Sequence, residues 1–242
     1  MTPLNEITHA LKCTQIADPA YKAFREKTSK LIVLGHRLPV LQTLARTGFS
    51  FYTKSPKNVL RIWNAIWKTS QTHEALTLPL VYYRHHLDQL GLSHWYVMKQ
   101  WIHRIENWEH ADSLCALYSV IFERFSTQIE PTLRTWNQSK NPWKQRASIV
   151  SLIYYTSPKR KAPSVKLVLE LVEPLIQSRD TYVAKAVGWT LRESYKLYPK
   201  ETLAFLTQHI HQLAPASFSY ATEKLSKIQK NLLKSMKLEF SL

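Results

Sequence analysis

The chain has 242 residues, 45% of them hydrophobic and 12% aromatic, so it is long and apolar enough to bury a sizeable core. Its formal net charge of +16 exceeds what solubility alone requires and indicates a polyanionic partner such as nucleic acid, although a ribosomal or membrane-surface protein would have a similar charge. The two cysteines lack metal-ligand spacing, and no apolar run approaches the roughly 18 residues of a membrane span, so we expect a soluble, cytoplasmic protein without disulfides, metal or membrane contact.

Helical periodicity begins at the N-terminus and continues through the first half of the chain. Asp18 is suited to cap a helix whose first residue is Pro19, and Gly35 is suited to end that helix. Ser55 and Pro56 open another helix with one apolar face, on which Trp63 and Trp67 are expected to pack. In this half we expect helices over residues 2–17, 19–35, 39–46, 56–68 and 72–91, and a further helix from residue 93.

The second half continues in the same style, and almost no segment alternates as a strand would. Asn141 and Pro142 resemble a capped helix start. The expected helices cover residues 112–125, 131–136, 143–155, 164–176, 181–198, 199–213 and 217–236. Short connections between them imply that consecutive helices are antiparallel neighbours.

About a dozen helices with short loops fit either a globular bundle or a stack of helix pairs. Helix pairs recur at intervals of roughly 30 to 40 residues, as in helical repeats, and basic segments are spread along the chain. We therefore predict an all-α, right-handed-type stack of antiparallel helix pairs with a concave basic face. No linker-like segment divides the chain, so we expect a single domain over residues 1–242.

The positive charges are concentrated in two tracts. Residues 27–73 and residues 134–166 each contain eight Lys or Arg and no Asp or Glu. A single tract of this kind is often just a solvated face, but two favour a phosphate-binding surface. Between the tracts lies a small acidic island formed by Glu106, Glu109 and Asp112.

Four segments, in this order, resemble the AlkD-type DNA alkylation repair family. They are HEALTLPLVYY from residue 73, WEHAD from residue 108, WNQSKNPWKQRASIV from residue 136 and YVAKAVGWTLRESYKLYP from residue 182. The third and fourth segments are specific in combination. The resemblance extends from about Tyr21 to Leu225 and implies a stack of HEAT-like helical repeats.

The resemblance also implies roles for particular residues. Trp108 and Asp112 match the family's aromatic and carboxylate pair, Trp189 its second aromatic, and Arg146 its phosphate-facing arginine. In that family the two tryptophans and the carboxylate face the deoxyribose of an alkylated nucleotide, whose base is removed at the N-glycosidic bond without a cofactor. We expect Trp143 and Lys144 to join Arg146 in binding DNA.

The implied function is a monomeric glycosylase that releases positively charged alkylpurines, such as 3-methyladenine and 7-methylguanine, from double-stranded DNA. Two other classes stay open: a catalytically silent helical-repeat protein that binds DNA or branched nucleic acid, and a protein-binding scaffold. Each residue also has a purely structural alternative. Asp112 could cap a helix that begins at Ser113, the three tryptophans could be core residues, and Arg146 could pair with Glu109 or cover apolar surface with its stem.

Overall fold

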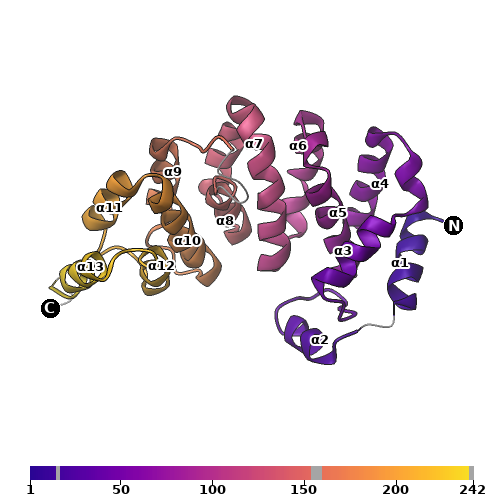
Figure 1. Cartoon of the computed structure of the whole chain (residues 1–242), viewed down its shortest axis with the longest axis horizontal. Coiled ribbons are helices and arrows are strands. Elements are labelled where there is room, and N and C mark those ends of the chain that lie inside the picture. Colours follow the sequence, from indigo (N-terminus) through magenta and orange to yellow (C-terminus); the bar gives the residue numbers. More distant parts are fainter. Residues whose placement is uncertain (15–16, 154–159, 240–242) are drawn as a thin grey trace. The chain divides into compact units, whose positions relative to one another are not determined.

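The computed structural model describes residues 1–14, 17–153 and 160–239 (Figure 1). Within these residues the chain is helical, with one isolated parallel bridge between Ile32 and Thr72 in place of any strand. It divides into two compact units, unit 1 (Met1–Leu117) and unit 2 (Tyr118–Leu242), and the division falls inside one helix, α7 (Trp108–Asn137). The two compact units are described separately below.

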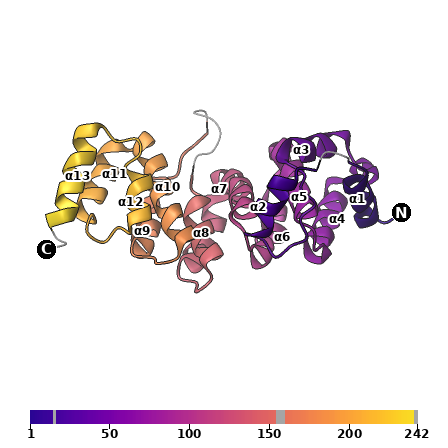
Figure 2. The same cartoon turned by 90° about the horizontal axis from the view of Figure 1, so that it is seen from below.

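Unit 1 is built around α5, which packs against α1, α3 and α4 (Figure 2). Its α-helices are α1 (Pro3–Cys13), α2 (Pro19–Glu26), α3 (Leu38–Thr47), α4 (Pro56–Thr69), α5 (His73–His85), α6 (Leu92–Met98) and the first turns of α7. It also contains three short 3-10 helices, η1 (Ser50–Thr53), η2 (Leu87–Gln89) and η3 (Trp101–Arg104). As predicted, Trp63 and Trp67 of α4 are core residues, each less than 2% exposed.

Unit 2 is built around α10, which contacts α8, α9, α11 and α12. Besides the rest of α7 it contains α8 (Pro142–Val150), α9 (Val165–Val172), the 3-10 turn η4 (Glu173–Leu175), α10 (Thr181–Leu197), α11 (Pro199–Gln208), α12 (Pro215–Ala221) and α13 (Lys227–Glu239). The close approach of α12 to α10 requires Gly188, because a Cβ there would lie 2.5 Å from the Ser217 carbonyl oxygen.

Two predicted N-terminal helices are too long. The first ends at Cys13 rather than residue 17, and Thr14 is already extended; residues 15 and 16 lie outside the described part of the chain. The second is capped by Asp18 as predicted but ends at Glu26. Beyond it, carboxylates bind the backbone N–H groups that a helix would have used: Glu106 accepts from Lys30 at 2.6 Å, and the buried Glu74 accepts from Leu34, Gly35 and His36.

The start of α7 also differs from the prediction. The helix begins at Trp108, not after Asp112, and Asn107 caps it by accepting the N–H of His110 at 2.9 Å. Asp112 therefore lies in the second turn, and its structural alternative as the N-cap residue is wrong. The two helices predicted over residues 112–125 and 131–136 are both part of α7: residues 126–130 are helical as well, and only Phe125 has non-helical torsions (φ −136°, ψ 41°), which mark a kink.

The C-terminal predictions need similar corrections. Asn141 caps α8 as expected, but that helix ends at Val150; residues 154 and 155 of the predicted segment lie outside the described part. The predicted helix over residues 217–236 is two helices, since α12 ends at Ala221 and α13 begins at Lys227. Lys237 of α13 donates to the carbonyl oxygens of Ile210 and Leu213, which ties the last helix to the end of α11.

Candidate functional site

The eight tryptophans fall into two groups by exposure. Five are buried: Trp63, Trp67, Trp95, Trp101 and Trp136. The other three are those that the sequence selected as functional: Trp108 is 37% exposed, and Trp143 and Trp189 are half-buried. These three tryptophans therefore keep part of their surface accessible, as a binding role requires.

In unit 1, Trp108 and Asp112 lie four residues apart at the start of α7 and therefore share one face of that helix. Asp112 is half-buried. The helix around them is firmly held, because Asn107, His110 and Ala111 are buried on its other side. The sequence-predicted aromatic and carboxylate pair is thus brought together on a rigid element.

A basic side chain that the sequence analysis did not select contacts Trp108. The guanidinium carbon of Arg25, on α2, lies 5.1 Å from the centre of the Trp108 ring, 5.1 Å from that of Tyr21 and 5.3 Å from that of Phe24. The same guanidinium forms an ion pair with Glu109 at 2.6 Å. Arg25 is only 5% exposed, so this pair is largely shielded from water.

Glu109 connects Arg25 to a buried histidine pair. Its second carboxylate oxygen lies 3.4 Å from Nε2 of His73, and the His73 ring stacks on His110 at 4.3 Å between centres. Burial lowers the pKa of His110 well below its usual value, and the neighbouring His73 adds to this effect. His110 is therefore neutral at physiological pH, with Nε2 bonded to Thr77 at 2.9 Å.

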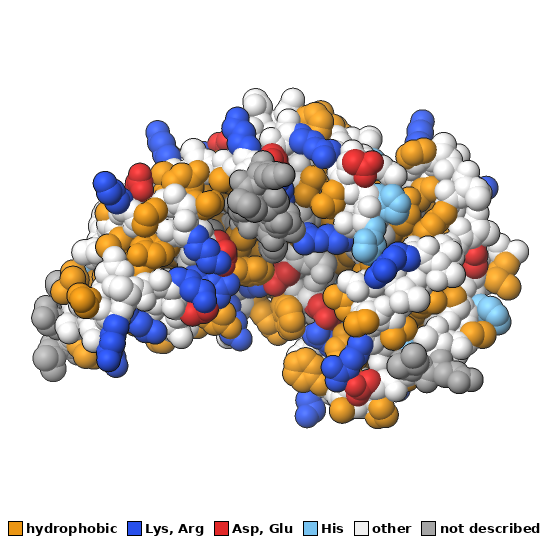
Figure 3. All heavy atoms as spheres, in the orientation of Figure 1, with side chains coloured by type: hydrophobic (Ala, Val, Ile, Leu, Met, Phe, Trp, Pro, Cys, Tyr) orange, Lys and Arg blue, Asp and Glu red, His pale blue; other side chains and the backbone are white. Residues whose placement is uncertain are grey.

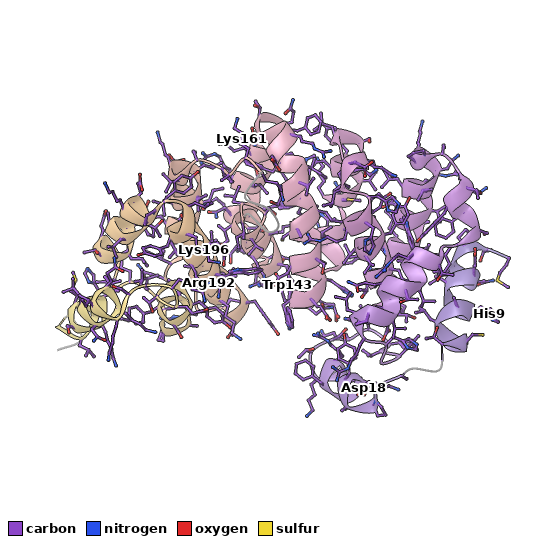
Figure 4. All side chains as sticks on the ribbon, viewed as in Figure 1. His9, Asp18, Trp143, Lys161, Arg192 and Lys196 are labelled. Carbon is purple, nitrogen blue, oxygen red and sulfur yellow. The ribbon has the colours of Figure 1, made fainter. Side chains whose placement is uncertain are left out.

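In unit 2, the predicted residues come together where α8 meets α10. The Trp143 ring packs on Tyr182 with centres 4.8 Å apart (Figure 4 labels Trp143). Arg146 donates from one terminal nitrogen to the Tyr182 carbonyl oxygen at 2.5 Å, and its guanidinium carbon lies 5.9 Å from the Trp189 ring centre. Lys144 is half-buried and follows Trp143 directly in the first turn of α8.

The N-terminal end of α8 makes this side of the cluster attractive to an anion. The N-terminus of a helix carries partial positive charge, and the first turn of α8 contains no acidic residue. The Asn141 side chain accepts the N–H groups of Trp143 and Lys144, which fixes both residues at the helix start. Arg146 differs from Lys144 in being only 5% exposed, and its guanidinium donates to a backbone carbonyl oxygen inside the protein.

In the second basic tract, residues 134–166, fewer basic side chains are available to bind an anion than the sequence indicates. Arg134 pairs with Glu130 and Glu170, Arg160 with Glu123, and Lys166 with Glu170, all acids outside the tract. On the face of the molecule in Figure 3, acidic side chains lie next to some of the basic ones. Among the described residues of the tract, Lys140, Lys144 and Lys161 form no such ion pair, and residues 154–159 lie outside the description.

Other classes of site find little support in the described residues. They contain no group of three or more His, Cys, Asp or Glu side chains arranged to hold a metal ion. Cys13 and Cys115 are both unbridged. None of the helices in this part of the chain is both long and apolar enough to cross a membrane.

The sequence matches the family described as DNA alkylation repair enzyme over residues 10–225. The match covers most of the chain and extends across both compact units. The chain therefore belongs to the DNA alkylation repair enzyme family, as the four motifs indicated. No curated protein sequence matches it.

Solved structures support the fold. One described as a predicted DNA alkylation repair enzyme from Enterococcus faecalis has a TM-score of 0.71 at 16% identity, covering 87% of this chain and 97% of that chain. AlkD2 from Streptococcus mutans has a TM-score of 0.51 at 17% identity, covering 91% and 97% of the two chains. The predicted all-α, HEAT-like repeat fold is thereby confirmed.

Arg25, Glu109 and Tyr182 were not singled out from the sequence as functional residues. Glu109 was visible as part of the acidic island, but its partner Arg25 is 84 residues away in sequence, so no local pattern could pair them. Tyr182 contributes its backbone carbonyl and a ring face, and the sequence could mark only its position seven residues before Trp189.

Proposed function

We propose that this protein is a DNA glycosylase of base excision repair that releases positively charged alkylpurines, such as 3-methyladenine and 7-methylguanine, from double-stranded DNA. Membership of the DNA alkylation repair enzyme family supports a role in repair of such damage. The observation that carries the finer proposal is the selective exposure of Trp108, Trp143 and Trp189 in a chain whose other five tryptophans are buried.

The chemistry suits a site without a general acid. Alkylation at N3 or N7 places a positive charge on the purine. When the bond between C1′ and the base breaks, its electron pair neutralises that charge and the base leaves as a neutral molecule. The sugar becomes oxocarbenium-like, as in glycoside hydrolysis, and water then adds to C1′ and loses a proton, leaving an abasic site.

The candidate residues match what this reaction requires. In unit 1, the Asp112 carboxylate would stabilise the sugar cation, an electrostatic contribution typically worth a few kcal/mol, and could orient the attacking water. The Trp108 ring would add cation–π attraction of about 0.5 to 2 kcal/mol, and Trp189 of unit 2 would do the same for the alkylated nucleotide.

The rest of the unit 2 cluster would bind the DNA backbone. Lys144, at the positive end of α8, is suited to a phosphate, and Trp143 to the adjoining sugar. Arg146 would face the backbone as the family resemblance implies, while also holding Tyr182 and Trp189 in position.

Single-turnover release of 7-methylguanine from methylated duplex tests this proposal. We expect the parent protein to release the base and Asp112→Asn to do so about 10²-fold more slowly, because one preorganised charge is lost. The affinity of the variant for DNA should be equal or higher, since a negative charge near phosphate is removed. Equal rates would exclude Asp112 from the mechanism, and no release by the parent protein would favour a binding-only protein.

A further inference from the structure

We propose that Arg25 is a positioning residue for Trp108, holding its ring at the angle that the reaction needs. The proposal rests on the proposed glycosylase function and concerns unit 1 alone. Arg25 contacts the ring of Trp108 and the carboxylate of the next residue, Glu109, so its planar guanidinium fixes two consecutive side chains at the start of α7.

The contacts of Arg25 are unusual for a buried arginine. One terminal nitrogen donates to Glu109, but Nε and the other terminal nitrogen are buried without a hydrogen-bond partner among the described residues. Those two nitrogens are surrounded by the rings of Tyr21, Phe24 and Trp108, each centred 5.1 to 5.3 Å from the guanidinium carbon. Ring faces therefore take the place of hydrogen-bond acceptors, which only a flat, delocalised cation suits well.

The Glu109 carboxylate makes this arrangement stable. Its oxygens also lie 3.4 Å and 3.5 Å from the Tyr21 hydroxyl, and 3.4 Å from His73 Nε2. Arg25 is the only α2 residue that is buried in the described part of the chain, so this polar cluster is a principal attachment of α2 to α7. Figure 1 shows α2 at the lower end of unit 1, beyond α3 and α5.

Trp108 itself depends on this contact because it is the most exposed tryptophan of the chain and lies in the first turn of its helix. A side chain with 37% of its surface open has few packing partners to select one rotamer. The contact with the Arg25 guanidinium favours one rotamer of Trp108. Arg25 acts through Trp108 and need not touch the substrate.

A double-mutant cycle with Arg25→Lys tests the proposal, because lysine keeps the charge beside Glu109 and removes the planar stack. In the parent background we expect base release to fall about three- to tenfold, the size of a lost cation–π contact, with unchanged affinity for DNA. In a Trp108→Ala background the same substitution should change the rate by less than about twofold. In a Trp189→Ala background, Arg25→Lys should again reduce the rate of base release by the full three- to tenfold.

Arg192→Lys is the matched control, since Arg192 also pairs with carboxylates, Glu193 and Glu223, but contacts none of the proposed functional residues. It should leave the rate unchanged. An equal loss from Arg25→Lys with and without Trp108, or no loss at all, would overturn the positioning role.

A second measurement does not require base release. The fluorescence of Trp108, obtained by subtracting the signal of Trp108→Phe from that of its parent, should be quenched by acrylamide about twice as strongly in Arg25→Lys. Unchanged quenching would contradict the proposal, whatever the glycosylase assay gives. If the parent protein releases no base but Arg25→Lys increases the quenching of Trp108, the glycosylase function is refuted and the positioning role of Arg25 still holds.

Discussion

At the scale of single residues, Arg146 and Lys144 are two candidates for the proposed contact with phosphate. Sequence resemblance assigns this role to Arg146, yet Arg146 is 5% exposed and donates to the Tyr182 carbonyl. Lys144 is more exposed and lies in the first turn of α8. Two neighbouring residues in the same motif therefore have different surroundings, which the sequence alone does not reveal.

Substitution of these two residues should have distinct effects on DNA binding. Lys144→Ala should flatten the slope of log affinity against log salt by about one unit, the value for one phosphate contact. Arg146→Ala should weaken binding with a smaller change of slope, because it mainly releases Tyr182 and Trp189. Salt titrations of duplex binding give both slopes. If only Arg146→Ala flattens the slope by a full unit, Arg146 rather than Lys144 binds the phosphate.

At the scale of elements, the sequence located most helices but not all their ends. The apolar face of α4, the extent of α10 and the caps Asp18 and Asn141 follow from local signals, and those predictions were correct. The helix ends that were misplaced depend on distant partners. The carboxylates of Glu74 and Glu106 bind backbone N–H groups about 40 and 76 residues away, and no local pattern records that.

Gly188 provides a test of element packing in unit 2. A Cβ at this position would lie 2.5 Å from the Ser217 carbonyl oxygen and 2.6 Å from Cβ of Tyr220. Because the closest atom is backbone, α12 must move away from α10, at an overpacking cost of about 1 to 3 kcal/mol. That exceeds the gain in helix propensity, at most about 1 kcal/mol.

Gly188→Ala should therefore lower the free energy of unfolding, measured by urea denaturation. It should also reduce DNA binding, since Trp189 is the next residue. An increase in stability would mean that α12 does not approach α10 this closely.

The histidine pair beneath the start of α7 predicts a pH dependence of unit 1. Burial, with a contribution from His73, lowers the pKa of His110 well below 6.5 in the folded protein, whereas the unfolded chain binds a proton near that pH. The unfolded state thus binds more protons below pH 6.5, and stability falls as pH falls through this range. The ion pair between Arg25 and Glu109 lies beside His73 in the same cluster.

We expect the contribution of His110 to the loss of stability to approach about 1.4 kcal/mol per pH unit below pH 6. His110→Asn removes the titrating group, so the slope of the unfolding free energy against pH should decrease between pH 6.5 and 5. Equal slopes for the parent protein and the variant would show that His110 is already protonated in the folded state.

At the scale of the whole molecule, family membership and the helical repeat fold could be predicted from four motifs in their order along the chain. The exposure of the three candidate tryptophans could not, because Trp63 and Trp189 occupy similar helical patterns in the sequence and only packing separates them. The acid-free tract over residues 134–166 was also misleading in part, since Arg134 and Arg160 in it are paired with acids that lie outside it in sequence.

The choice of lesion tests the central claim most directly. A carboxylate and two aromatic faces can assist only a base that already carries positive charge, because none of these groups can protonate a neutral base. Duplexes containing 7-methylguanine, uracil, hypoxanthine or 1,N6-ethenoadenine should be incubated with the protein under identical single-turnover conditions. We predict release of 7-methylguanine alone, slower release with Trp189→Ala, and no release of the neutral bases by either protein; efficient removal of uracil would contradict the account.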